Sequence, residues 1–152
     1  MNLEAKEQSF QNELNKEIEK IDRRLSKLLN GKKPESLYEP CSYVLKSGGK
    51  HLRGYLVLLS TKAVGGKYLQ SYNAALSVEI LHSFTLVHDD IMDNADKRRG
   101  VPSLHKKYDV NTAILAGDSL IAVAYKNLLK DCKINTVNVL NTFNQSVIDV
   151  CE

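Results

Sequence analysis

The chain contains few residues that end helices. Its 152 residues include 8 Gly and 3 Pro, about 7% of the chain, where average composition has about 12%. Few sharp turns can be built from such a sequence, which favours long helices. Charged residues make up 26%, and no stretch approaches the roughly 20 consecutive apolar residues that a membrane-spanning helix needs. The composition excludes the disordered, fibrous and membrane-spanning classes and indicates one soluble domain or a piece of one.

Neither charge nor cysteine content points to a special partner or compartment. The chain has 21 Lys plus Arg and 18 Asp plus Glu, and this excess is too small by itself to indicate a nucleic-acid partner. Cys41, Cys132 and Cys151 form no C-x-x-C pair, and no secretory leader follows Met1. We therefore expect a cytoplasmic protein whose cysteines are reduced and buried as small hydrophobic residues.

Apolar residues recur every three or four positions along most of the chain, a spacing typical of amphipathic helices. A first helix is predicted over residues 3–29, ended by Asn30-Gly31 and Pro34. Further helices are predicted at 36–46, 51–64, 68–94, 111–129 and 134–152, with a charged loop at 96–102. No strand pattern competes with this interpretation, so the predicted fold class is all-α.

The last predicted helix keeps its apolar spacing up to the final residues, with no Gly, Asn or Pro to end it. Such a pattern leaves helix faces without an evident partner layer, which a free domain tolerates poorly. We therefore expect residues 1–152 to be part of a single larger domain. Within it, residues 1–30 form an amphipathic N-terminal helix, and residues 36–152 carry the motifs described next.

An acidic cluster interrupts the apolar run of the fourth predicted helix. Asp89 and Asp93, on either side of Asp90, are four residues apart and share one helix face, and His82 falls on the same stripe. Two carboxylates so placed suit Mg²⁺, which is usually held by one or two carboxylates together with water and phosphate oxygens. A solvated acidic turn has the same spacing, so the cluster alone leaves both interpretations open.

Two cationic segments flank this cluster along the chain. Upstream, the segment 48–53 reads G-G-K-H-L-R and opens a predicted helix; downstream, the segment 97–100 reads K-R-R-G. Helix N-termini expose unpaired N–H groups, glycine lets an anion approach the backbone, and Arg can bind two phosphate oxygens. Together with the carboxylates, these segments predict a site for Mg²⁺ and a polyphosphate. Each segment alone is as compatible with a helix break or a charged surface.

Other single residues are interpreted as structural. His88 and His105 are expected to be core histidines. Asp118 is expected to be either an interior polar contact or a partner that supports a site residue, and the structural role is favoured. The aromatic residues Phe84, Tyr125 and Phe143 lie on apolar helical stripes and are expected in the core.

In chain order, these motifs resemble those of the trans-isoprenyl diphosphate synthases, the polyprenyl synthetases of farnesyl and geranylgeranyl type. The resemblance rests on G-G-K-H-L-R, E-I-L-H, L-V-H-D-D-I-M-D, R-R-G-V-P and L-A-G-D, and it covers nearly the whole chain after residue 35. It implies a helical bundle around a central cavity, of which this chain resembles the N-terminal half. It also implies a homodimer.

The resemblance implies a Mg²⁺-dependent prenyltransferase, with Mn²⁺ as a possible substitute. The reaction would condense isopentenyl diphosphate head-to-tail with an allylic diphosphate, giving a short-chain prenyl diphosphate for isoprenoid biosynthesis. On this resemblance Asp89 and Asp93 bind the metal, supported by Asp90. Arg98 would hold the allylic diphosphate.

The same resemblance assigns the second substrate and the prenyl tail. Lys50, Arg53, His82 and Arg99 would bind isopentenyl diphosphate. Phe84, five residues before the first motif aspartate, would help to form the floor of the prenyl-tail pocket. A bulky floor favours a short product of farnesyl or geranylgeranyl length.

The sequence also departs from the family pattern. His51 stands where the family usually has Arg, and Gly54 where it usually has Pro. The second aspartate-rich motif of the family is absent, and the family shares its metal ions between both motifs. We therefore expect that this chain does not turn over by itself.

Three other functions remain open on the sequence. The chain could be a non-catalytic or regulatory subunit of a two-chain synthase, although such a subunit does not need the complete metal motif found here. It could be a class I terpene cyclase, although a cyclase needs no isopentenyl diphosphate site of the kind that Lys50 and Arg53 suggest. It could also be a helical interaction module, which the ordered set of motifs disfavours.

Overall fold

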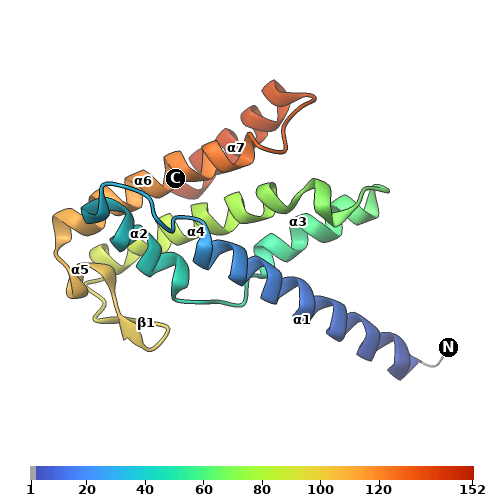
Figure 1. Ribbon diagram of the computed structural model, residues 1–152, viewed down its shortest axis with the longest axis horizontal. Coiled ribbons are helices and arrows are strands. Elements are labelled where there is room, and N and C mark those ends of the chain that lie inside the picture. Colours follow the sequence, from blue (N-terminus) through green and yellow to red (C-terminus); the bar gives the residue numbers. More distant parts are fainter. Residues whose placement is uncertain (1–2) are drawn as a thin grey trace.

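The computed structural model describes residues 3–152 (Figure 1). The helices are α1 (Leu3–Lys27), α2 (Glu35–Lys46), α3 (Leu52–Ala63), α4 (Tyr72–Met92), α5 (Leu104–Lys107), α6 (Val110–Leu128) and α7 (Thr136–Cys151), with a 3₁₀-helix at Tyr68–Gln70. Strands β1 (Lys97–Arg98) and β2 (Val101–Pro102) pair antiparallel and form the only sheet in the described part of the chain. The all-α class is confirmed.

Two local features differ from the predicted helices. The helix predicted over residues 68–94 is divided, because the 3₁₀-helix ends at Ser71 before α4 begins. The charged loop predicted at 96–102 contains the β1–β2 hairpin. A two-residue hairpin turn of type I′ has positive φ at both turn positions, and Arg99 and Gly100 have φ of 53° and 83°. Sequence periodicity missed the hairpin because two-residue strands show no alternation.

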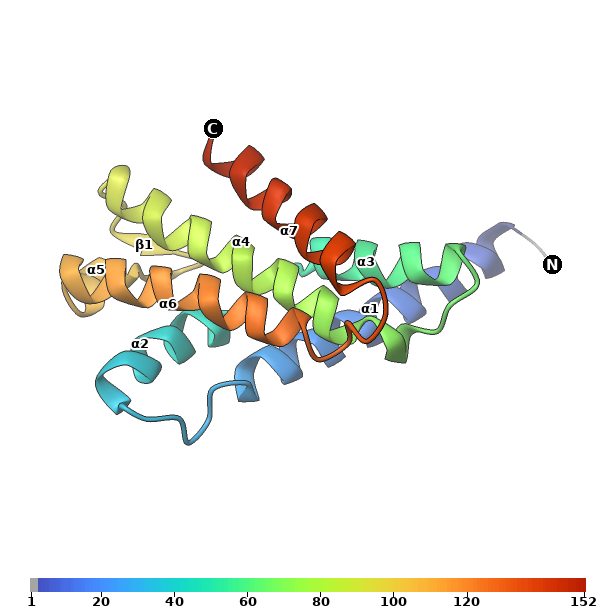
Figure 2. The same cartoon turned by 90° about the horizontal axis from the view of Figure 1, so that it is seen from above.

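Helices α4 and α6 pack along each other at the centre of the molecule (Figure 2). Helix α2 covers α6, α3 covers α4, and α1 crosses against α2, α3 and α4, while its first turns extend past the other helices. The core between these elements contains fully buried side chains from α1, α3, α4 and α6: Ile21, Leu58, Ile80 and Leu120. None of the helices in residues 3–152 is both long and apolar enough to cross a bilayer.

Helix α7 is attached to the rest of the molecule at few points. Phe143 is its only buried residue, and its ring packs edge-on against Tyr125 of α6 with centroids 5.1 Å apart. Asn144 accepts a hydrogen bond from the Tyr125 hydroxyl at 2.8 Å. Val137 and Val150 of the same helix are 70% and 59% exposed. Helix α7 therefore leaves most of its surface exposed, and its Ser146 and Val150 line a groove together with residues of α4.

The cysteine expectation is only partly right. Cys41 is buried, and its thiol donates to the carbonyl of Ala116 at 3.5 Å. Burial raises the pKa of Cys41 to about 11, so this thiol is unreactive at neutral pH. Cys132 is half-buried, and the prediction is wrong for Cys151, which is exposed because α7 packs only around Phe143.

Candidate functional site

A cationic cavity of about 550 Å³ opens between the segment before α3 and helix α4. The structure brings together here the four residues that the resemblance assigns to isopentenyl diphosphate. The lining comprises Ser47, Gly49, Lys50 and His51 of the segment, Leu52 and Arg53 of the first turn of α3, Glu79 and His82 of α4, and Arg99 of the hairpin. Three permanent or near-permanent cations therefore share one concave surface, which suits a doubly or triply charged anion.

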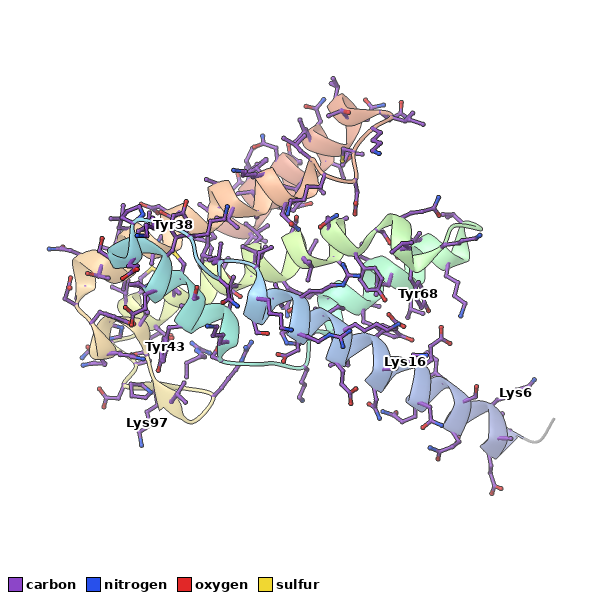
Figure 3. All side chains as sticks on the ribbon, viewed as in Figure 1. Lys6, Lys16, Tyr38, Tyr43, Tyr68 and Lys97 are labelled. Atoms are coloured by element: carbon purple, nitrogen blue, oxygen red, sulfur yellow. The ribbon has the colours of Figure 1, made fainter. Side chains whose placement is uncertain are left out.

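The hairpin is held in place by contacts at its base. The Tyr43 hydroxyl of α2 donates to the carbonyl of Pro102 at 2.8 Å, and the buried Ser103 hydroxyl donates to the carbonyl of Ala95 at 2.5 Å. Figure 3 shows Tyr43 and Lys97 at the same end of the molecule. Because the strands are only two residues long, these contacts fix where the turn presents Arg98 and Arg99.

Arg99 reaches from the hairpin to the segment before α3. A Cβ atom on Gly49 would lie 2.8 Å from Nη1 and 2.9 Å from Cζ of Arg99. Glycine at this position therefore leaves room for the guanidinium. The two cationic segments, far apart in sequence, meet at this contact.

His82 and Arg53 form the boundary of the cavity. Arg53 Nη1 lies 3.3 Å from His82 Nε2. Since Arg can only donate, this nitrogen of His82 must accept, and the proton of the neutral ring resides on Nδ1. Burial and the neighbouring Arg53 and Arg99 lower the pKa of His82, although Glu79 and Asp89 oppose the shift. His82 is therefore a neutral polar contact between two cations.

The segment is attached to the core by His51 and Glu79. His51 is 6% exposed, and its Nδ1 and Nε2 lie 2.9 Å from Glu79 Oε2 and 3.0 Å from Asp22 Oδ1. Glu79 also accepts from the backbone N–H of Gly54 at 2.8 Å. A Cβ on Gly54 would approach Glu79 Cγ to 3.0 Å, so glycine allows α3 to lie close to α4.

The three aspartates at the end of α4 have different surroundings. Asp90 is 4% exposed, and its Oδ1 accepts from Arg98 Nε at 2.9 Å and Nη2 at 2.6 Å. These bonds to Asp90 raise the pKa of Arg98. Asp89 is half-buried, Asp93 is exposed as the C-cap of α4, and neither forms an ion pair within residues 3–152.

Asp89 and Asp93 are electrostatically unfavourable where they stand. The C-terminal end of a helix carries partial negative charge, and like charges four residues apart repel. The last turn of α4 contains no basic residue. Arg98, which forms its ion pair with Asp90, also attracts both carboxylates without forming an ion pair with either. Two oxygen ligands without an ion pair of their own fit a hard divalent cation whose remaining ligands are water or phosphate oxygens. Among residues 3–152, no three His, Cys, Asp or Glu side chains form a ready metal-binding group.

A groove of about 440 Å³ joins the acidic end of α4 to the cationic cavity. Arg53 and His82 line both spaces, so the cavity and the groove are neighbours on either side of this pair. The groove is completed by Val78, Leu81, Thr85 and Asp89 of α4 and by Ser146 and Val150 of α7. It combines an apolar wall with a carboxylate at one end and cations at the other.

Phe84 and Thr85 face different surroundings. Phe84 is 7% exposed and packs edge-on against the ring of His88, with centroids 4.8 Å apart. It is absent from the linings of the cavity and the groove, whereas the smaller Thr85 lines the groove. The groove wall beside Asp89 is thus formed by Thr85.

Sequence reasoning missed three residues that shape this site. Glu79 lies in the E-I-L-H motif but receives no role from it, yet a carboxylate in an apolar helical run calls for a buried partner. His51 differs from the usual family residue, and the sequence alone does not show that its ring contacts Glu79. Tyr43 gave no signal, because its bond to Pro102 joins segments 59 residues apart.

The molecule is an all-α bundle in which two cationic segments meet beside the acidic end of a helix. This arrangement is typical of proteins that bind polyphosphates together with a divalent cation. The family model described as Polyprenyl synthetase matches residues 34–152. The chain belongs to the polyprenyl synthetase family, as the sequence predicted.

Named relatives agree with this assignment. The chain is 40% identical over 134 residues to the geranylgeranyl pyrophosphate synthase of Geoglobus acetivorans, covering 87% of this chain and 42% of that protein. It is 37% identical over 147 residues to the geranylgeranyl diphosphate synthase of Sulfolobus acidocaldarius, covering 94% and 44%. The chain thus spans less than half the length of these relatives.

Solved structures give the same result. The geranylgeranyl pyrophosphate synthetase of Geoglobus acetivorans matches with a TM-score of 0.86 and 37% identity, over 91% of this chain and 46% of that one. The corresponding enzyme of Pyrococcus horikoshii matches with a TM-score of 0.87 and 34% identity, over 96% and 45%. The expected fold is confirmed.

Proposed function

We propose that this chain forms the diphosphate-binding and metal-binding half of a short-chain prenyltransferase of geranylgeranyl type. The enzyme condenses isopentenyl diphosphate with an allylic diphosphate. The observation that carries the proposal is that the cationic cavity and the acidic groove are neighbours that share Arg53 and His82. Two neighbouring sites, one cationic and one acidic, can hold two different diphosphates with their reacting carbons between them.

In this proposal the cavity holds isopentenyl diphosphate. Lys50, Arg53 and Arg99 neutralise its charge, and neutral His82 adds a polar contact without further repulsion between cations. The apolar side chains of Val78 and Leu81 in the adjoining groove accommodate the hydrocarbon part. Binding of the substrate through its remote charged end orients its double bond towards the groove.

The allylic diphosphate is proposed to lie at the acidic end of α4. Asp89 and Asp93 would hold Mg²⁺ or Mn²⁺ there, and the metal supplies charge that stabilises the departing diphosphate. Arg98 is oriented by buried Asp90 and leaves part of its guanidinium exposed for a phosphate oxygen. Asp90 thus supports the site through Arg98, and Thr85 bounds the space for the tail. Phe84 lies outside this lining and packs against His88.

Calorimetric titration of the chain tests these assignments. Isopentenyl diphosphate is expected to bind without Mg²⁺ and to lose about tenfold in affinity in Arg53→Ala. Geranyl diphosphate is expected to bind only when Mg²⁺ is present. In the double variant Asp89→Asn, Asp93→Asn, this Mg²⁺-dependent binding is expected to be lost. Lys33→Ala and Glu19→Gln, which change exposed charges outside the site, are the matched controls. Equal loss in the controls would contradict the proposal.

Turnover is proposed to require more than these 152 residues, because the relatives are over twice as long and one wall of the groove is the sparsely packed α7. A radiolabelled prenyl-transfer assay with the chain alone is expected to give no product above a no-enzyme control. Steady product formation would refute this part of the proposal. The cytoplasmic homodimer that family membership suggests belongs to the same proposal.

A further inference from the structure

The segment that supplies Lys50 to the cavity lies outside helices and strands. It runs from Ser47 at the end of α2 to His51, the residue before α3. Gly48 has φ of 70° and His51 has φ of 46°, a left-handed conformation that is uncommon for a residue other than glycine. Lys50 is exposed. Something other than regular secondary structure must therefore hold the backbone that carries this cation.

His51 provides that attachment. Both of its ring nitrogens face carboxylate oxygens, Glu79 of α4 at 2.9 Å and Asp22 of α1 at 3.0 Å. A neutral imidazole has one N–H and can donate to only one of them, whereas the imidazolium donates to both. The geometry therefore selects the charged ring. The ring connects the segment to two helices at once.

Glu79 extends the attachment into α3. Its Oε2 lies against His51, and its Oε1 accepts from the N–H of Gly54, in the first turn of α3. Arg53 lies between these two points and reaches His82. Lys50 and Arg53 are thus one residue before His51 and one residue before Gly54, the two anchored positions.

We infer that His51 is a positioning residue for the diphosphate cavity: its ring, clamped between Asp22 and Glu79, sets where Lys50 and Arg53 stand. The inference rests on the function proposed for that cavity. His51 touches no reacting atom in this role and acts through its two cationic neighbours.

The contact of His51 with Asp22 and Glu79, called the clamp below, depends on the charge of the His51 ring. The groups that face it are Asp22 from α1, Glu79 and His82 from α4, Arg53 from α3, and Lys50 and Arg99 along the cavity wall. Burial by itself lowers the pKa of His51, but the bonds to Glu79 and Asp22 outweigh burial and raise it. The clamp is therefore closed at neutral and mildly acidic pH, and it loses one bond as pH rises through the raised pKa.

Two substitutions distinguish the clamp from ordinary packing. His51→Gln keeps a similar length but carries no charge, so it cannot satisfy two carboxylates. His51→Arg keeps a permanent charge with donors on several sides. His105→Gln removes the other buried histidine among the described residues and controls for the loss of a buried ring.

The experiment measures binding of inorganic pyrophosphate by calorimetry at pH 6 and pH 9. Hydrogen exchange of segment 47–53 and of α6 is followed in parallel. His51→Gln is expected to bind about tenfold more weakly than the unaltered chain at pH 6, with a smaller ratio at pH 9. Its exchange is expected to rise in segment 47–53 and to stay constant in α6. His51→Arg is expected to restore binding and to remove the pH dependence of exchange in the segment.

Unchanged binding and exchange in His51→Gln would overturn the inference, because His51 would then not hold the segment. Faster exchange throughout α6, with the same losses in His105→Gln, would overturn it as well, because the role of His51 would then be purely structural. An unaltered chain that binds no pyrophosphate, yet shows pH-dependent exchange in segment 47–53, would instead overturn the proposed function of the cavity and leave the clamp itself standing. The two failures are therefore distinguishable.

Discussion

The cationic end and the acidic end of the candidate site are built in opposite ways. At the cationic end, Glu79 is buried and satisfied by His51 and Gly54, so the backbone that carries Lys50 is fixed before any ligand arrives. At the acidic end, Asp89 and Asp93 stand at the negative end of α4 without an ion pair among the described residues. One end is preorganised by internal contacts, whereas the carboxylates of the other end have no ion pair of their own among the described residues.

The largest expected difference in stability between the two ends comes from substitution of Glu79. Glu79→Ala leaves the His51 charge with Asp22 alone and removes the acceptor for Gly54, so unfolding is expected to become easier by about 3 kcal/mol. Asp89→Ala is expected to change the free energy of unfolding by less than about 0.5 kcal/mol. Urea denaturation of both variants gives the difference. Equal effects would mean that the two ends are not built differently.

A larger residue at position 49 is expected to lower the affinity for pyrophosphate with little change in folding stability. The Ala methyl group in Gly49→Ala meets the Arg99 guanidinium, which can swing away at little cost in stability but then leaves the cavity. Pyrophosphate affinity is expected to fall about tenfold, or 1.4 kcal/mol. In an Arg99→Ala background the same substitution is expected to have no further effect. Additive losses in this double-mutant cycle would show that Gly49 acts independently of Arg99.

The clamp gives the cationic end a defined pH window of stability. The pKa of His51 is raised above 6.5, so its contribution is complete below about pH 6.5 and is lost as pH rises through the raised value. The pKa of Glu79 is lowered below 4.5, since the bonds from His51 and Gly54 outweigh burial, and its contribution is lost as pH falls below about 4.5. The clamp therefore stabilises most between these values.

In urea titrations, His51→Gln is expected to cost about 1 kcal/mol near pH 5.5 and less at pH 9. His105→Gln is measured alongside it. A His51→Gln deficit that stays constant from pH 5.5 to pH 9 would contradict a charged clamp.

The smallest expected effect concerns the acidic end. Asp93→Asn removes one like charge from the end of α4 and is expected to stabilise the metal-free chain by about 0.5 kcal/mol. It is also expected to abolish the Mg²⁺-dependent binding of geranyl diphosphate. Asp118→Asn, in the middle of α6, serves as its control in thermal unfolding with and without MgCl₂. Destabilisation by Asp93→Asn would show that this carboxylate is structural.

The sequence determined the all-α fold, most of the helix boundaries and the family. Helical periodicity is a local property, and the charged motifs stand in a fixed order along the chain, so both can be read without contacts. The acidic cluster on α4 was visible for the same reason, because residues four apart on one helix share a face wherever the helix packs.

Only the tertiary structure decided how the charges combine. Arg99 meets Gly49 across 50 residues, His51 joins Asp22 to Glu79 from three separate elements, and Asp90 is used by Arg98. The exposure of Cys151 and the place of Thr85 on the groove wall were likewise set by how α7 and α4 lie. Such outcomes depend on which helix faces meet, and periodicity within one helix carries no information about its partner.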